Sequence, residues 1–101
     1  MAAADGPRRV AVLIYPDIAL TDMAGPLEAF GLANYIAGRS FYELMTVAAS
    51  LAPISVGGSF CTVTPTHSFD TLEGPLDTLL IAGGPASKDV SRDEATLAFL
   101  R

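Results

Sequence analysis

The hydrophobic positions of this chain form continuous runs, a helical stripe and short alternating segments. Residues 10–15 and 76–82 are apolar on both alternating faces, which is typical of strands buried on both sides of a sheet. Residues 42–49 predict a further strand. Residues 54–56 and 60–64 are joined by a Gly-Gly-Ser segment and predict a β-hairpin.

The helical stripe follows the first strand. Its apolar side chains recur every three or four positions: Met23, Leu27, Phe30, Ala33 and Ala37. Pro26 is expected in the first helical turn, where a missing N–H costs no hydrogen bond. Gly38 is expected to end the helix with a positive φ. A second helix is predicted to open at the capping box Ser91-x-x-Glu94 and to continue to residue 100, and residues 65–72 are expected to be a connection.

This order of elements predicts an α/β fold. The sequence runs strand, helix, strand, hairpin, strand, helix, as in the N-terminal half only of a flavodoxin-like doubly wound parallel sheet with an inserted β-hairpin. At 101 residues the chain holds at most one domain. Residues 1–8 are expected to be a flexible leader, and residues 9–101 the N-terminal part of that domain.

Composition narrows the classes of function. Half of the residues are hydrophobic, only 17% are charged and the net charge is −5. With one lysine, Lys88, and scattered arginines, the segment is not expected to contact nucleic acid. The single cysteine, Cys61, excludes an internal disulfide and fits a reducing compartment. No stretch suits a signal or membrane segment, so the prediction is a cytoplasmic protein.

Asp22 is the first candidate for chemistry. It follows a predicted buried strand and a short loop, and in open parallel sheets ligands bind at the carboxyl ends of the strands. The alternative is structural, since an acid in a first helical turn stabilises the helix dipole by about 0.3–1 kcal/mol. Glu28 lies within the helix and is expected to face solvent.

Gly83-Gly84-Pro85 is the second candidate. These residues follow the strand at 76–82 directly, so their backbone N–H groups could stabilise an oxyanion. The alternative is a tight strand-to-loop turn. The chain has no phosphate-binding loop of the G-x-x-x-x-G-K or G-x-G-x-x-G type.

Cys61 and His67 are weaker candidates for a catalytic or metal-binding role. Cys61 lies in the predicted hairpin, where a structural thiol is expected because a nucleophile needs an exposed turn and a low pKa. His67 is expected to be an exposed loop residue. One histidine and one cysteine do not make a metal site of the usual ligand count, so neither a metal nor another cofactor is predicted.

Several segments together resemble one known family. They are residues 10–15, Asp22-x-x-Gly25-Pro26-x-Glu28-x-Phe30, Leu32-Ala33-Asn34, Tyr42-Glu43-Leu44 and residues 76–85. With these segments in this order, the chain resembles the ThiJ/PfpI branch of the class I glutamine amidotransferase-like superfamily. More narrowly, it resembles the N-terminal sensor domain of AraC-type transcriptional regulators. Related isonitrile hydratases share the acid-containing loop and the Gly-Gly strand end.

The resemblance implies roles for particular residues. Asp22 matches the acid that contacts a cysteine on a nucleophile elbow in family enzymes, and Gly83 and Gly84 match the turn that helps to form the oxyanion hole. The elbow is expected after the last helix, beyond residue 101, and Cys61 is not its counterpart. The resemblance therefore implies an incomplete catalytic site with Asp22 as candidate acid, and a ligand site that includes Asp22, Gly83, Gly84 and Pro85.

Three functions compete at this point. The first is the ligand-sensing and dimerisation part of an AraC-type regulator, non-catalytic by itself, with an unknown small-molecule ligand and DNA contacts made by another domain. The second is a fragment of a ThiJ/PfpI hydrolase or isonitrile-hydratase-like enzyme, cut before its cysteine. The third is a free-standing binding module. A homo-oligomer is expected, and stable folding is expected only with further polypeptide that covers the apolar strands.

Overall fold

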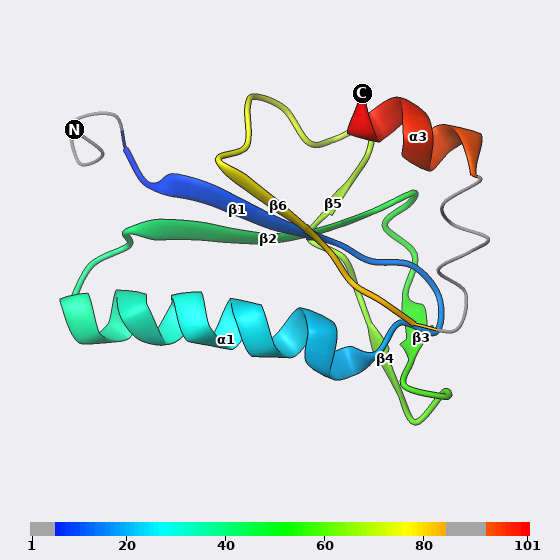
Figure 1. The fold of residues 1–101 in the computed structure, drawn as a ribbon, viewed down its shortest axis with the longest axis horizontal. Coiled ribbons are helices and arrows are strands. Elements are labelled where there is room, and N and C mark those ends of the chain that lie inside the picture. Colours follow the sequence, from blue (N-terminus) through cyan, green and yellow to red (C-terminus); the bar gives the residue numbers. More distant parts are fainter. Residues whose placement is uncertain (1–5, 85–92) are drawn as a thin grey trace.

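The computed structural model describes residues 6–84 and 93–101 (Figure 1). Its strands are β1 (Arg8–Leu13), β2 (Tyr42–Ala48), β3 (Ile54–Val56), β4 (Cys61–Val63), β5 (His67–Ser68) and β6 (Thr78–Ile81). Its helices are α1 (Leu20–Ala37) and α3 (Glu94–Leu100). Four strands form a parallel sheet in the order β5-β2-β1-β6, and β3 and β4 form an antiparallel hairpin. The predicted α/β fold with a parallel sheet and an inserted hairpin is confirmed.

The core of the molecule is built around β1. Residues 10–14 are at most 1% exposed, because β1 is paired on both edges and covered on both faces. Successive side chains of a strand point to opposite faces. Val12 and Ile14 pack in one cluster with the first turns of α1 and the hairpin, while Ala11 and Leu13 pack in another with Phe99 of α3. The helices α1 and α3 therefore cover opposite faces of the sheet (Figure 1).

The helix α1 is longer at its N-terminus than expected. It begins at Leu20, so Pro26 lies in the second turn and the predicted place of this proline in the first turn is wrong. Because proline has no N–H, it makes no backbone hydrogen bond to the carbonyl of Asp22, four residues earlier. Gly38 ends the helix with a φ of 71°, as predicted.

Only part of the predicted apolar stripe of α1 is covered. Met23 and Leu27 pack against the core cluster of β1, but Ala33 and Ala37 at the other end are exposed. The helix also exposes three large apolar side chains on its C-terminal half: Leu32, Tyr35 and Ile36 are 58%, 83% and 75% exposed. The contribution of α1 to the core therefore comes from its first turns.

The hairpin fixes the loop between β1 and α1. The backbone N–H of Asp17 donates to the carbonyl of Ser55 over 2.7 Å, and the N–H of Gly57 donates to the carbonyl of Ile18 over 3.0 Å. Asp17 has a φ of 65°, a left-handed conformation that aspartate adopts more readily than most residues. The chain that leads into α1 is thus held by main-chain bonds from the hairpin.

Residues 65–72 contain an edge strand that the hydrophobic pattern did not predict. β5 has two residues, too few for any periodicity, and extends the sheet at the end of β2. Thr46 and Thr66 support the junction, since the backbone N–H of each donates to the hydroxyl of the other over 2.9 Å. His67 consequently lies half-buried on a strand, and its expected place in an exposed loop is wrong.

The helix α3 begins after Asp93, whose carboxylate caps it. Asp93 Oδ2 accepts hydrogen bonds from the backbone N–H and the hydroxyl of Thr96, at 2.9 and 2.8 Å. These bonds, the backbone one first, hold the pKa of the Asp93 carboxyl below its ordinary value. The predicted capping residue Ser91 lies outside the described residues, and the observed cap stands two residues later in the chain.

Candidate functional site

Asp22 and the Gly83 backbone meet at the carboxyl ends of β1 and β6. The N–H of Gly83 donates a hydrogen bond of 3.0 Å to Asp22 Oδ2, and the carbonyl of Gly83 accepts one of 2.8 Å from the N–H of Ala19. β1 and β6 are neighbours in the sheet, while the intervening chain forms strands on the other side of β1. We call the place where Asp22 meets Gly83 and Gly84 the Asp22 corner. It lies where the strand order reverses, and open α/β sheets bind ligands at such places. The predicted proximity of Asp22 to the Gly83-Gly84 turn is confirmed.

The hydrogen bond to Asp22 changes the chemistry expected of the glycine turn. The N–H of Gly83 was expected to be free for an oxyanion, and this expectation is wrong because a carboxylate oxygen already accepts from it. The Asp22 side chain is exposed, and no described residue donates a hydrogen bond to its other oxygen, Oδ1. In this arrangement the corner can offer an oriented carboxylate acceptor to a ligand. Asp22 also lies in the first turn of α1, so its stabilising effect on the helix dipole operates together with this contact.

Gly84 packs closely against the backbone of the loop between β1 and α1. A β-carbon placed on Gly84 would lie 2.8 Å from the carbonyl oxygen of Asp17 and 2.9 Å from the α-carbon of Ile18. A β-carbon on Gly83 would lie 2.9 Å from Asp22 Oδ2. Gly84 is thus required by close approach to the backbone of the β1–α1 loop, while the close contact of Gly83 is with a movable carboxylate. Pro85, the last residue of the predicted ligand site, lies outside the described residues.

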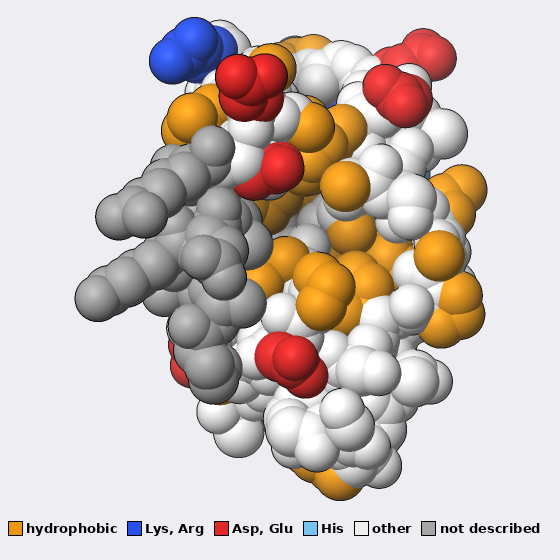
Figure 2. Space-filling view, turned by 90° about the vertical axis from the view of Figure 1, so that its right-hand side faces the viewer, with side chains coloured by type: hydrophobic (Ala, Val, Ile, Leu, Met, Phe, Trp, Pro, Cys, Tyr) orange, Lys and Arg blue, Asp and Glu red, His pale blue; other side chains and the backbone are white. Residues whose placement is uncertain are grey.

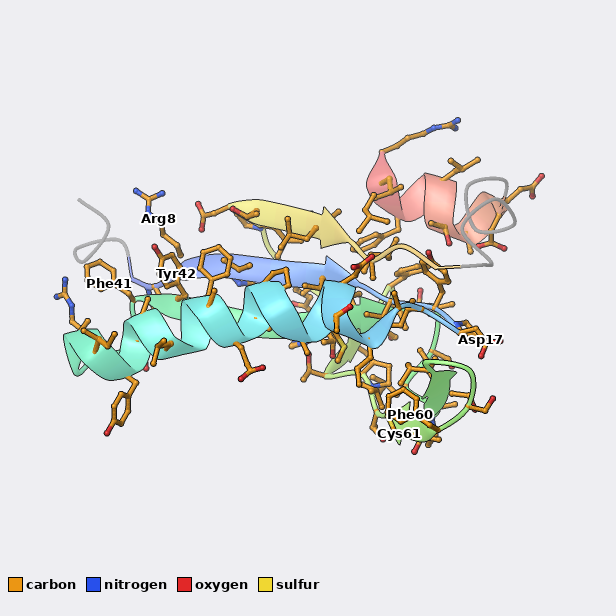
Figure 3. The ribbon with its side chains drawn as sticks, turned by 60° about the horizontal axis from the view of Figure 1, so that its bottom comes forward. Arg8, Asp17, Phe41, Tyr42, Phe60 and Cys61 are labelled. Carbon is orange, nitrogen blue, oxygen red and sulfur yellow. The ribbon has the colours of Figure 1, made fainter. Side chains whose placement is uncertain are left out.

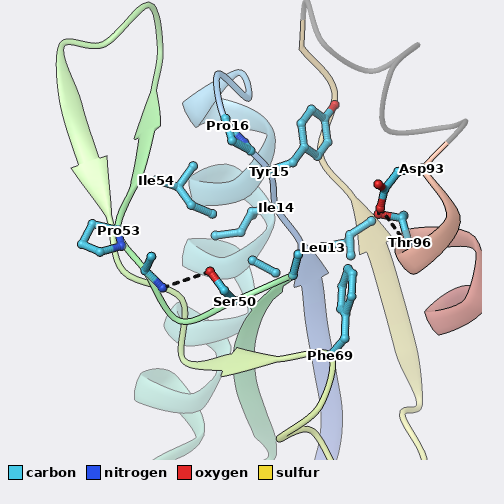
Figure 4. Close-up of a pocket in the computed structure, with 13 residues that line it drawn as sticks. Leu13, Ile14, Tyr15, Pro16, Ser50, Pro53, Ile54, Phe69, Asp93 and Thr96 are labelled. Carbon is cyan, nitrogen blue, oxygen red and sulfur yellow. Dashed lines mark hydrogen bonds between the residues drawn. The ribbon is translucent and has the colours of Figure 1, made fainter.

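An apolar cavity of about 450 Å³ opens at the carboxyl ends of β1 and β2. Figure 2 shows this end of the molecule, where hydrophobic side chains gather in a hollow with carboxylates around it. The cavity walls come from Leu13, Ile14, Ile54 and Phe69 (Figure 4). Asp93 and Ser50 contribute polar groups; the Ser50 hydroxyl accepts from the N–H of Ala52 over 3.3 Å. The volume and the apolar lining fit a small, mainly hydrophobic molecule.

Tyr15 joins this cavity to the Asp22 corner, and the sequence interpretation missed it. Its ring lines the cavity and extends from the end of β1 toward the segment that follows β6 (Figure 4). The residue is 6% exposed, and its hydroxyl has no hydrogen-bond partner among the described residues. Burial raises the pKa of the Tyr15 hydroxyl, and the nearby carboxylate of Asp22 raises it further. In the sequence, Tyr15 could have been noticed because its hydroxyl is a polar group at the end of the otherwise apolar run of residues 10–15.

The other candidate residues lie apart from this arrangement. Cys61 is half-buried on β4 beside Phe60, in the hairpin (Figure 3), and its side chain packs against the core. Thr66 Oγ1 lies 2.9 Å from Nδ1 of His67. Within residues 6–84 and 93–101, no three His, Cys, Asp or Glu side chains group as metal ligands would. In the same part of the chain, no helix has the length and hydrophobicity needed to cross a membrane.

Two motifs of the family resemblance have structural roles in this fold. The Asn34 side chain pairs with the backbone of Tyr42, donating from Nδ2 to its carbonyl and accepting from its N–H at Oδ1, each over 2.9 Å. Glu43 forms a salt bridge of 3.3 Å with Arg9. These contacts fix the start of β2 against α1 and β1, away from the carboxyl ends of the strands.

Comparison with known proteins supports the fold and part of the resemblance. No family model matches the chain. A protein of Streptomyces lividans, described as an uncharacterized protein in the cpoL 5′ region, is 33% identical over 81 residues, which are 80% of this chain and 55% of that protein. The chain thus spans about half the length of this curated relative.

Solved structures give closer information on the fold. A ThiJ/PfpI family protein from Pseudomonas syringae is 29% identical with a TM-score of 0.80, over 94% of this chain and 37% of that one. An AraC family transcriptional regulator from Pseudomonas putida is 15% identical with a TM-score of 0.64, over 85% of this chain and 55% of that one. The resemblance to ThiJ/PfpI proteins, inferred from the sequence, is confirmed in the fold, and AraC-family regulators share that fold.

Proposed function

We propose that this chain is the N-terminal, ligand-sensing and dimerising part of an AraC-type transcriptional regulator, and that it is not a catalyst by itself. One observation carries the proposal: the Asp22–Gly83 corner stands beside an apolar cavity at the carboxyl ends of the strands. This arrangement can orient a small molecule through one carboxylate while apolar walls enclose its body. The AraC-family regulator from Pseudomonas putida, which shares the fold, supports the same assignment.

The chemistry of the described residues favours binding over catalysis. Nucleophilic catalysis needs an activated thiol or hydroxyl within reach of its base. The one cysteine of the chain lies on the hairpin strand β4 and packs against the core, which differs from a strand-to-helix elbow. We expect the chain to turn over none of the substrates of ThiJ/PfpI enzymes. Turnover that disappears in Cys61→Ser, with the fold retained, would contradict this expectation.

The exposed end of α1 supports self-association. Leu32, Tyr35 and Ile36 lie within five residues on one helix and are each more than half exposed. Surfaces of this kind are typical of interfaces. The proposed dimer therefore forms through the C-terminal half of α1, with DNA contacts supplied by a separate domain.

The test of this function uses the gene and the purified chain. A basic helix-turn-helix encoded after Arg101 would support the regulator, and an elbow cysteine without any DNA-binding domain would overturn it. Because the segment carries a net charge of −5, we expect it to leave duplex DNA unshifted in a gel at physiological salt. A salt-dependent shift by the chain itself would contradict the proposed division between sensing and DNA binding.

A second candidate function rests on the ThiJ/PfpI neighbour. The protein from Pseudomonas syringae has a higher TM-score and identity than the regulator, and this chain covers 37% of it. In this alternative the chain is a fragment of a hydrolase or an isonitrile-hydratase-like enzyme, and Asp22 would contact a cysteine supplied by later sequence. A turnover assay of the whole gene product, with and without that cysteine, separates the two functions.

A further inference from the structure

We propose that Tyr15 is the polar recognition residue of the cavity, and that its hydroxyl donates a hydrogen bond to a neutral carbonyl-type acceptor on a small, mainly apolar ligand. The inference deepens the proposed sensing function and rests on it. It starts from a buried polar group without a described partner, in a place where ligands of this fold class are expected.

The burial of the Tyr15 hydroxyl is the first step. A buried donor without a partner carries a desolvation penalty, so native structures retain few such groups without a reason. Tyr15 is 6% exposed, and its ring packs in the cluster that contains Ile18 and Ala82. Phenylalanine would fill the same apolar space without that penalty. The hydroxyl therefore needs an acceptor that residues 6–84 and 93–101 do not supply.

The position of Tyr15 supplies the second step. Its ring is part of the wall of the 450 Å³ cavity, and its hydroxyl is close enough to Asp22 for that carboxylate to affect it. Both effects on its pKa are upward, so the phenol stays protonated at neutral pH and is available as a donor. The oxygen itself is buried, so a ligand at this end of the cavity would contact it with its polar end after a turn of the Tyr15 ring, and would contact Leu13 or Phe69 with its apolar body.

Charge selects the class of acceptor. Asp22 raises the pKa of the hydroxyl, Asp93 lines the cavity, and among the described residues that line it there is no lysine or arginine. An anionic ligand would be repelled by these carboxylates. A ketone, ester or amide carbonyl accepts a hydrogen bond without adding a negative charge. The geometry therefore favours a neutral acceptor over a carboxylate.

The test compares three probes of similar shape on the purified whole gene product, which includes any further polypeptide needed for stable folding. Acetophenone carries a carbonyl, α-methylstyrene replaces that oxygen by a CH₂ group, and benzoate carries a negative charge. Dissociation constants come from amide NMR shifts of residues that line the cavity. We expect acetophenone to bind about three- to tenfold more tightly than α-methylstyrene, which is the range for one net hydrogen bond, and benzoate to bind most weakly.

Two tyrosine variants separate the hydroxyl from the rest of the protein. Tyr15→Phe should remove the preference for acetophenone and leave α-methylstyrene binding unchanged. Tyr42→Phe makes the same chemical change at the start of β2, away from the residues that line the cavity, and should behave as the wild type. A preference for acetophenone that persists in Tyr15→Phe, or equal binding of the two probes to the wild type, would overturn the role of Tyr15 while leaving a ligand site in place.

Two further outcomes complete the test. If no probe shifts the residues of the cavity, both the ligand site and the role of Tyr15 fail. Chemical unfolding checks the remaining possibility of a structural hydroxyl. Tyr15→Phe should leave the folding equilibrium constant unchanged or raise it, because the phenol loses no described partner. A fall in that constant relative to Tyr42→Phe would show that the hydroxyl has a structural partner and would overturn the proposal.

Discussion

Leu13→Ala is expected to lower the free energy of unfolding by about 2–5 kcal/mol, the usual cost of removing a large buried side chain. Leu13 is 1% exposed at the end of the central strand, where it packs with Met45 and Val47. The same side chain forms part of the cavity wall, so the substitution should also enlarge the candidate ligand site. Urea unfolding followed by circular dichroism measures the change.

The matched control for this prediction is Leu51→Ala. It removes the same atoms from a leucine between β2 and β3 that is 48% exposed, and should change the free energy of unfolding by no more than about 0.5 kcal/mol. Equal losses for the two variants would show that the two leucines are similarly buried in solution. That result would contradict the position of β1 at the centre of the sheet.

Gly84→Ala is expected to destabilise the chain by about 1–3 kcal/mol and to weaken acetophenone binding at the Tyr15 end of the cavity. The added β-carbon would lie 2.8 Å and 2.9 Å from backbone atoms of Asp17 and Ile18, and backbone is costly to move. To admit a methyl group, the β1–α1 loop would have to shift away from the end of β6. Thermal unfolding and acetophenone titration measure the two effects.

Alanine substitutions at two other glycines serve as comparisons for the stability of Gly84→Ala. Gly25 lies in α1 with nothing within 4 Å of an added β-carbon, so Gly25→Ala should raise stability by about 0.5–1 kcal/mol. Gly83→Ala should fall between the two, because its clash is with the movable carboxylate of Asp22. A Gly84→Ala variant as stable as the wild type would contradict the close contact of the Gly-Gly turn with the loop.

The elements with strong local signals could be predicted from the sequence. The continuous apolar run at residues 10–15 gave the central strand, and Gly38 gave the end of α1. The two-residue strand β5 could not be predicted, because its hydrogen bonds come from β2, twenty residues earlier. The start of α1 was misplaced because the hairpin, which lies later in the sequence, holds the loop before it.

The candidate site was predicted only where topology determines it. Asp22 and Gly83 each follow a strand of one parallel sheet, so their meeting followed from the strand directions. Their hydrogen bond did not, since it depends on the rotamer of one carboxylate. The cavity and the buried hydroxyl of Tyr15 were also missed, because they depend on tertiary contacts with residues 50–54, Phe69 and the first turn of α3.

The central claim is that the carboxyl end of the sheet, between the Asp22 corner and the apolar cavity, is a ligand site. The most direct measurement is an amide NMR titration of the purified whole gene product with acetophenone, followed residue by residue. The account predicts shifts concentrated at residues 14–16, 48–54 and 82–84 and at Phe69. Shifts confined to the groove along α1 near Met23, Leu27 and Leu32, or no saturable shifts at all, would contradict it.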